Sequence, residues 1–98
     1  MVQFMADITL PDNPAPEFFA LIPLQRLQVG ILFKSGRLSS YALSLDRKKL
    51  WAVFNGNSLD EIQNIIDIFP LRAFMQVTIQ ELAFVEEPIF QFPTFSLN

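Results

Sequence analysis

The chain has 98 residues, 51% of them hydrophobic and 17% charged, which indicates one small folded domain and excludes an intrinsically disordered chain. It has no cysteine and no histidine, so thiol chemistry, disulfides and the commonest side chain for proton transfer and metal binding are absent. The net charge of −3 argues against nucleic-acid binding, and no apolar run approaches the roughly 18 residues of a membrane span.

The first predicted elements are a strand and a long helix. Residues 2–10 alternate between apolar side chains and a mixed set, which is typical of a half-buried strand. A helix is predicted to begin near Pro16, a residue tolerated in the first turn, and to end at about Lys34 before Gly36. Pro23 predicts a kink in this helix, or a short first turn followed by the main helix.

The second half of the chain predicts two strands, a short helix and a final strand. Residues 38–45 and 49–55 are rich in strand-forming side chains and flank a basic turn. Residues 58–61, Ser-Leu-Asp-Glu, form a capping box that begins a helix with one apolar stripe, and Pro70 ends it. Residues 75–82 alternate again and predict the last strand.

This order predicts a ferredoxin-like α+β fold over residues 1–84, with two helices on one face of a four-stranded antiparallel sheet. The other face of the sheet has no helix to cover it, and the chain is very apolar for its size. We therefore expect self-association, as a homodimer or a larger ring. Residues 85–98 form an aromatic, proline-containing tail that we expect to pack on a neighbouring subunit.

Residues 69–75, Phe-Pro-Leu-Arg-Ala-Phe-Met, resemble the segment that follows the second helix in the muconolactone isomerase family. Residues 58–62 and 7–11 fit the same pattern. The resemblance extends over residues 2–82 and is clearest over residues 50–82. It implies a dimeric α+β barrel, often assembled into a decamer, and an isomerase that moves a double bond in a lactone by proton transfer.

The resemblance also implies positions for site residues. The family's helix-borne glutamate aligns with Gln25, or with Arg26 after a shift of one residue, and its histidine falls near Ser40. Neither glutamine nor arginine can accept a proton near neutral pH. These three residues are therefore candidate ligand-binding positions, and the family's catalytic glutamate and histidine are expected to be missing.

Three further candidates come from residue chemistry. Asp7 is the one carboxylate on the mixed face of the first strand, which makes it the candidate catalytic base; a hydrogen-bonded structural role is the alternative. Tyr41 and Trp51 each offer an apolar body with one polar tip, which suits a ligand pocket as well as an ordinary core. Arg26 could hold an anionic ligand and the basic residues 47–49 a phosphate, with a solvated surface as the alternative for both.

Three functions remain open at this point. The first is a muconolactone isomerase-like protein that binds a small organic molecule in its barrel without the family's catalytic set. The second is an active isomerase or cofactor-free oxygenase that uses Asp7. The third is a structural or interaction module with a filled barrel. We expect no cofactor and no metal, and a cytoplasmic location by default, since no signal peptide is visible.

Overall fold

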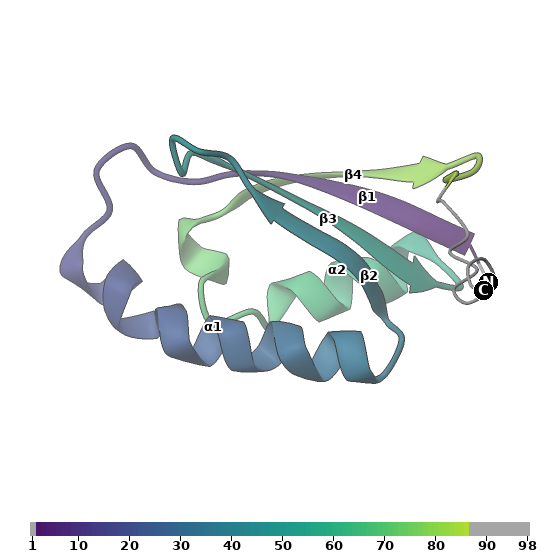
Figure 1. The fold of residues 1–98 in the computed structure, drawn as a ribbon, viewed down its shortest axis with the longest axis horizontal. Helices are drawn as coiled ribbons and strands as arrows, with labels where there is room; N and C mark the ends of the chain where they lie inside the picture. The colour runs from purple at the N-terminus through teal and green to yellow at the C-terminus, as the bar shows by residue number, and fades with distance from the viewer. Residues whose placement is uncertain (1, 87–98) are drawn as a thin grey trace, which may run out of the picture.

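The computed structural model describes residues 2–86, and in this range the elements follow the predicted order (Figure 1). The bounds are β1 (Val2–Thr9), α1 (Pro16–Lys34), β2 (Leu38–Leu43), β3 (Lys49–Gly56), α2 (Leu59–Asp67) and β4 (Gln76–Leu82). A short 3₁₀ helix, η1 (Arg72–Phe74), precedes β4 and was not predicted. Residues 87–98 of the predicted tail lie outside the described residues.

The four strands form one antiparallel sheet in the order β2-β3-β1-β4, and both helices lie on the same side of it (Figure 1). The ferredoxin-like α+β prediction is therefore confirmed. We call the side under the helices the covered face and the opposite side the open face. Along β1, Phe4, Ala6 and Ile8 are buried on the covered face, while Met5 and Asp7 belong to the open face and are only partly buried.

Local sequence sets the ends of both helices. At the start of α2, Ser58 Oγ accepts from the Glu61 N–H (3.2 Å). Glu61 Oε1 accepts from the Asn57 N–H (2.9 Å), whereas a standard capping box would use the N–H of Ser58. At the end of α1, Gly36 takes a φ of +77°. The Arg37 N–H then reaches the carbonyl of Leu32 (3.0 Å), which is a Schellman ending. Residues 16–34 form one continuous helix that includes Pro23, so the alternative of a separate short first turn is wrong.

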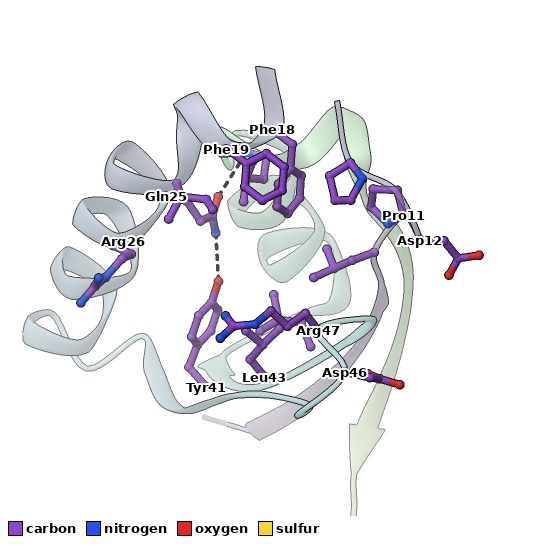
Figure 2. A pocket seen from close by; sticks show the side chains of 15 residues that line it. Pro11, Asp12, Phe18, Phe19, Gln25, Arg26, Tyr41, Leu43, Asp46 and Arg47 are labelled. Carbon is purple, nitrogen blue, oxygen red and sulfur yellow. Dashed lines mark hydrogen bonds between the residues drawn. The ribbon is translucent and has the colours of Figure 1, made fainter. Parts of the chain in front are cut away.

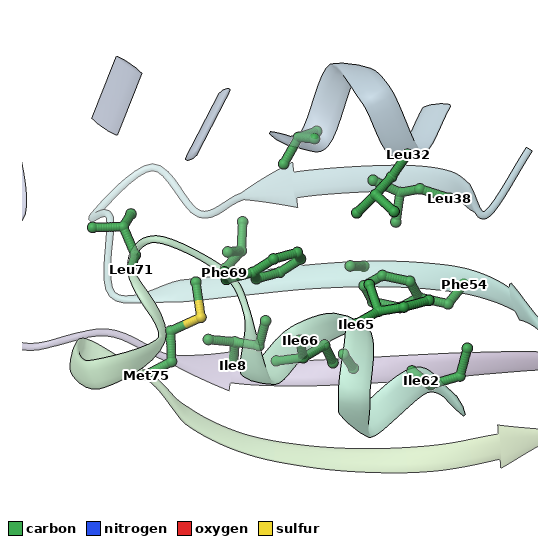
Figure 3. Packing of buried hydrophobic residues seen from close by; sticks show 14 of the residues in the cluster. Ile8, Leu32, Leu38, Phe54, Ile62, Ile65, Ile66, Phe69, Leu71 and Met75 are labelled. Carbon is green, nitrogen blue, oxygen red and sulfur yellow. The ribbon is translucent and has the colours of Figure 1, made fainter. Parts of the chain in front are cut away.

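The core lies between the covered face and the helices, and it is densest under α2 (Figure 3). Ile62 and Ile66 of α2 are fully buried, and they lie in one cluster with Phe54 of β3 and Phe69. The buried side chains of α1 are sparser for its 19 residues, with Phe18, Val29 and Leu32 as the apolar ones, whereas α2 buries three isoleucines in 9 residues. The two helices therefore contribute unequally to the core.

An irregularity in β2 decides which side its later residues face. The register runs from Leu38 opposite Phe54 directly to Ser40 opposite Val53, so one extra residue is accommodated between them. After this bulge, Tyr41 pairs with Ala52 and so shares the covered face, whereas Ser40 turns to the open face. Without the bulge, Ser40 would share the covered face with Leu38 and Tyr41 would turn to the open face.

Among residues 2–86, neither helix combines the length and apolar character needed to cross a membrane.

Candidate functional site

The candidate site is a cavity of about 590 Å³ between the first half of α1 and one end of the covered face. This volume lies within the range of about 300–1,000 Å³ that is usual for small-molecule sites. The walls are mostly apolar, and they come from α1, the ends of β1, β2 and β3, and the segment after α2. The apolar residues that line it are Leu10, Pro11, Pro14, Phe18, Phe19, Ile22, Leu43, Leu50 and Leu71.

Gln25 and Tyr41 supply the polar groups inside the cavity (Figure 2). Gln25 is only 3% exposed, and it is the one polar residue buried in the described part of the chain. Its Oε1 accepts from the backbone N–H of Leu71 (3.2 Å), and its Nε2 donates to the hydroxyl of Tyr41 (3.2 Å). The Leu71 amide thus fixes which end of the Gln25 side chain faces Tyr41. Because the Tyr41 oxygen already accepts one hydrogen bond, its own proton is free to donate toward the cavity.

Burial raises the pKa of Tyr41 above its ordinary value of 10.0, and the hydrogen bond from Gln25 only partly opposes this shift. The phenol is therefore neutral at physiological pH. It can donate a hydrogen bond to a carbonyl or carboxylate oxygen, but it does not serve as a base there.

The two arginines at the cavity point in different directions. The side chain of Arg47 is directed toward Tyr41, whereas Arg26 extends away from it at the edge of the site (Figure 2). Arg47 has a φ of 65°, the left-handed conformation, which is uncommon for a residue with a side chain. Neither arginine forms an ion pair with another of residues 2–86.

The two acidic residues at the cavity rim point outward and are already engaged (Figure 2). Asp12 pairs with Lys48 (3.3 Å). Asp46 accepts from the Ser44 hydroxyl (2.6 Å) and from the Lys48 backbone N–H (3.0 Å). The hydrogen bond from Ser44, followed by that from Lys48, lowers the pKa of Asp46, which makes it a weaker base. Among residues 2–86, the cavity thus has hydrogen-bond donors and one inward-directed cation, but no inward-directed carboxylate.

The six predicted site residues separate onto the two faces of the sheet. Gln25, Arg26 and Tyr41 line the cavity on the covered face. Asp7, Ser40 and Trp51 do not, because the strand register turns all three to the open face: Asp7 pairs with Trp51, and Ser40 pairs with Val53. No single ligand the size of this cavity can contact both groups within one protomer.

Asp7 lies in a small polar network on the open face. Its carboxylate forms an ion pair with Lys49 Nζ, which also donates to the hydroxyl of Thr9 (3.0 Å). The Oδ1 atom of Asp7 is buried and faces only this ammonium group. A base at Asp7 would serve a ligand on the open face, so its predicted catalytic role stays a prediction that the cavity does not support.

Sequence reasoning missed Arg47 and the apolar walls of the cavity. Arg47 lies in an exposed turn, as predicted, but its side chain is directed toward Tyr41, which the sequence did not indicate. Phe18 and Ile22 lie within the predicted helix, but the sequence did not mark them as walls of a cavity. In residues 2–86, no group of three or more acidic side chains is placed to hold a metal ion.

Comparison with known proteins gives a match in structure alone. No protein-family model matches the sequence, and no curated protein matches it. The solved structure of muconolactone isomerase superposes with a TM-score of 0.70 over 91% of this chain and 96% of that chain, at 17% identity. A structure of 5-chloro-2-hydroxyhydroquinone dehydrochlorinase from Burkholderia phenoliruptrix, in complex with 2,5-dihydroxybenzoquinone, gives 0.53 over 78% and 90%, at 12% identity. The resemblance to muconolactone isomerase is therefore confirmed as a resemblance in fold.

Proposed function

We propose that this protein binds a small, largely apolar organic molecule that carries an oxygen acceptor, in the cavity between α1 and the covered face. The observation that carries this proposal is the Gln25–Tyr41 pair, a buried and fixed donor at the wall of an otherwise apolar space of about 590 Å³. A cavity of this size also argues against a module whose interior is filled by its own side chains.

Two solved proteins of this fold support the choice of ligand class. One is an isomerase named for a lactone, and the other was solved with an oxygenated ring compound, 2,5-dihydroxybenzoquinone. Both molecules are small and present oxygen acceptors on a compact carbon skeleton. The Tyr41 hydroxyl and the Arg47 guanidinium are the groups that would contact such oxygens here, while Phe18, Ile22 and Leu50 would contact the skeleton.

We further propose that this site binds without the proton transfer that the resemblance implies. The resemblance aligns the family's glutamate with Gln25, or with Arg26 after a shift of one residue, and neither side chain is a carboxylate. Gln25 is held by two hydrogen bonds. The carboxylates of Asp12 and Asp46 point out of the cavity and are engaged with other groups. General acid–base catalysis typically contributes about 10²–10⁴-fold, and it needs a titrating group within hydrogen-bond reach of the substrate.

A nuclear magnetic resonance titration tests where the ligand binds. The probes are muconolactone and 2,5-dihydroxybenzoquinone, added separately to isotope-labelled protein. We expect shifts at the Leu71 amide and at the Gln25 side-chain amide, which lie at the cavity. The indole N–H of Trp51, the sole tryptophan, lies on the open face and is the internal control. Shifts at Trp51 without shifts at Leu71 would move the site to the open face and favour a function based on Asp7.

Variants then test the donors. Tyr41→Phe removes one neutral hydrogen bond and should weaken binding by about 2–10-fold. Arg47→Gly removes the guanidinium while keeping a residue that tolerates the left-handed turn. The matched control is Arg37→Gly, since Arg37 is an exposed arginine paired with Glu61, outside the cavity. Equal affinities for Arg47→Gly and Arg37→Gly would remove Arg47 from the proposed site.

An activity assay separates binding from catalysis. We expect the unmodified protein to give no isomerisation of muconolactone above the uncatalysed rate. Gln25→Glu would place a carboxylate between the Leu71 amide and the Tyr41 hydroxyl, where it could act as a base. Turnover by the unmodified protein near the common value of about 10 s⁻¹ would contradict the proposed lack of proton transfer. Turnover that appears only in Gln25→Glu would support it.

We also propose that the chain self-associates through the open face of the sheet. The middle of this face is apolar, with Met5, Ala42, Trp51 and Val53 next to one another across β1, β3 and β2. Because Trp51 is the only tryptophan, its fluorescence reports on this face directly. We expect its emission to shift to longer wavelength on dilution, in step with a fall in mass measured by light scattering. A stable monomer at micromolar concentration would contradict the proposal.

A further inference from the structure

The outward face of α1 is apolar, which is unusual for a helix at the surface of a sheet. Leu24, Leu27 and Ile31 are 55%, 63% and 51% exposed, and Ala20 lies on the same face. Their spacing of three and four residues places them in one stripe, on the side opposite the buried residues of the helix. A surface helix normally carries polar residues there, so this stripe is suited to contact another apolar surface.

We propose that this stripe pairs with the same stripe of a second copy of the chain, with the two α1 helices antiparallel about a two-fold axis between Leu24 and Leu27. In this register Leu24 lies against the partner's Leu27, and Ala20 lies against the partner's Ile31. A two-fold contact is isologous, so each of these contacts occurs twice. On either side of the central leucines, the small Ala20 of one copy therefore lies against the large Ile31 of the other.

Charge complementarity selects this occupant and this direction. The same register brings Glu17, in the first turn of α1, beside the partner's Lys34, in the last turn. Within residues 2–86, neither Glu17 nor Lys34 forms an ion pair. A parallel pairing would instead place like charges together. Such exposed ion pairs contribute little to affinity, but they discriminate between registers and between directions.

Gly30 lies on the flank of α1, about 60° around the helix from Leu27, in open space. A Cβ atom added at this position would meet no atom within 4 Å, so no described neighbour requires a glycine. Glycine inside a helix costs about 1 kcal/mol relative to alanine.

The area of this contact is modest. One helix stripe supplies a few hundred Å² per copy, below the roughly 1,200–2,000 Å² total of a typical stable interface. We therefore expect α1 pairing to act together with a second contact, such as the open face of the sheet, and to join smaller assemblies into a larger one. It does not depend on the cavity or on its ligand.

Cysteine cross-linking tests the register directly, because the natural chain has no cysteine. In Leu27→Cys the two positions are offset by about 4.5 Å along the helices, at 1.5 Å per residue, which is within reach of a disulfide. In Lys34→Cys the offset is about 25 Å. We expect a covalent dimer on mild oxidation for Leu27→Cys and none for Lys34→Cys. Leu45→Cys, in a turn where Leu45 is 100% exposed, measures random collision.

The oligomeric mass gives the second measurement. Leu27→Asp should lower the mass seen by light scattering, whereas Ile68→Asp, at an equally exposed apolar position beside α2, should not. Glu17→Lys and Lys34→Glu should each lower it, and the double variant should restore it. An unchanged mass with a lowered melting temperature in Leu27→Asp would mean that the chain covers this stripe itself, and the proposal would be wrong. It would also be wrong if Leu27→Cys cross-linked no faster than Leu45→Cys.

Discussion

The two ends of the space between the helices and the sheet differ in packing. At the end under α2, Phe4, Phe54, Ile62 and Ile66 fill the volume, and each is at most 1% exposed. At the end under the first half of α1, the apolar side chains surround a cavity of about 590 Å³. We expect the first end to contribute more to stability, and the second end is where we propose that a ligand binds.

The difference follows from the two helix sequences. In α2 the apolar residues occupy one narrow stripe, so the helix can approach the sheet closely along its whole length. In α1, Gln25 occupies a position in phase with Phe18, Val29 and Leu32, so a polar side chain is directed at the covered face. Its polar groups must be satisfied, and Tyr41 and the Leu71 amide do this. A polar pair then takes the place of interlocking apolar side chains beside the cavity.

The largest expected effect is a core truncation at the filled end. Ile66→Ala removes a fully buried side chain from a close-packed cluster and should lower the free energy of unfolding by about 2–5 kcal/mol. Ile22→Ala at the hollow end should cost clearly less, because the Ile22 side chain already borders empty space. Urea unfolding of both variants measures this difference. Equal losses would contradict the contrast between the two ends.

The next largest effect is expected at the buried polar pair. Gln25→Ala leaves the Leu71 N–H without its partner and should cost about 1–3 kcal/mol in the free energy of unfolding. The matched control is Gln28→Ala on the same helix, at a position with no hydrogen bond to another described side chain. The control should stay within about 0.5 kcal/mol of the unmodified protein. If the two variants were alike, the hydrogen bonds of Gln25 would not be stabilising.

The filled end should also reject an added methyl group. A Cβ at Gly56 would approach Ile62 Cδ1 to 2.8 Å, so Gly56→Ala should destabilise the protein by about 1–3 kcal/mol. Gly30→Ala, where the added atom meets nothing, should instead stabilise the single protomer by about 0.5–1 kcal/mol. Thermal unfolding at low protein concentration compares the two, and shifts of the same sign would contradict the packing described here.

A smaller effect is expected at the helix cap beside the filled end. Ser58→Ala removes the acceptor for the Glu61 N–H and should cost about 0.5–2 kcal/mol in chemical unfolding. Ser35→Ala is the control: the Ser35 hydroxyl donates to the Leu32 carbonyl (3.1 Å), but that carbonyl also accepts from the Arg37 N–H in the ending that Gly36 allows, so less should be lost. A larger loss for Ser35→Ala would assign the wrong residue to helix capping.

The sequence predicted the elements well because their signals are local. The capping box at residues 58–61, Pro16 and Gly36 each act within one turn of the chain, and the helix ends agree with them. The site was only partly predictable because it depends on which face of its helix or strand each side chain occupies. Gln25 can be recognised as a buried polar residue from its phase with Phe18 and Val29. The bulge before Ser40 exchanges the faces of Ser40 and Tyr41 in β2, and no pattern in the sequence predicted this bulge.

The smallest expected effect depends on pH and isolates Tyr41, the only tyrosine in the sequence. Its pKa is raised by burial in the folded state, while the unfolded chain ionises it near its ordinary value of 10.0. The neutral phenol therefore favours folding up to about pH 10, and this contribution is lost as the pH rises through the folded-state pKa, because the unfolded chain releases the proton first. The decisive quantity is the difference in stability loss between the unmodified protein and a variant without the phenol. Between pH 9 and pH 11, the unmodified protein should lose more stability than Tyr41→Phe, which has no phenol to ionise.

Ultraviolet absorbance of the phenolate gives the folded-state midpoint directly, and a ligand that accepts a hydrogen bond from Tyr41 should raise that midpoint further. A midpoint at or below the ordinary value would mean that the Tyr41 hydroxyl is solvated, and it would then not be the buried donor that the proposed binding site requires.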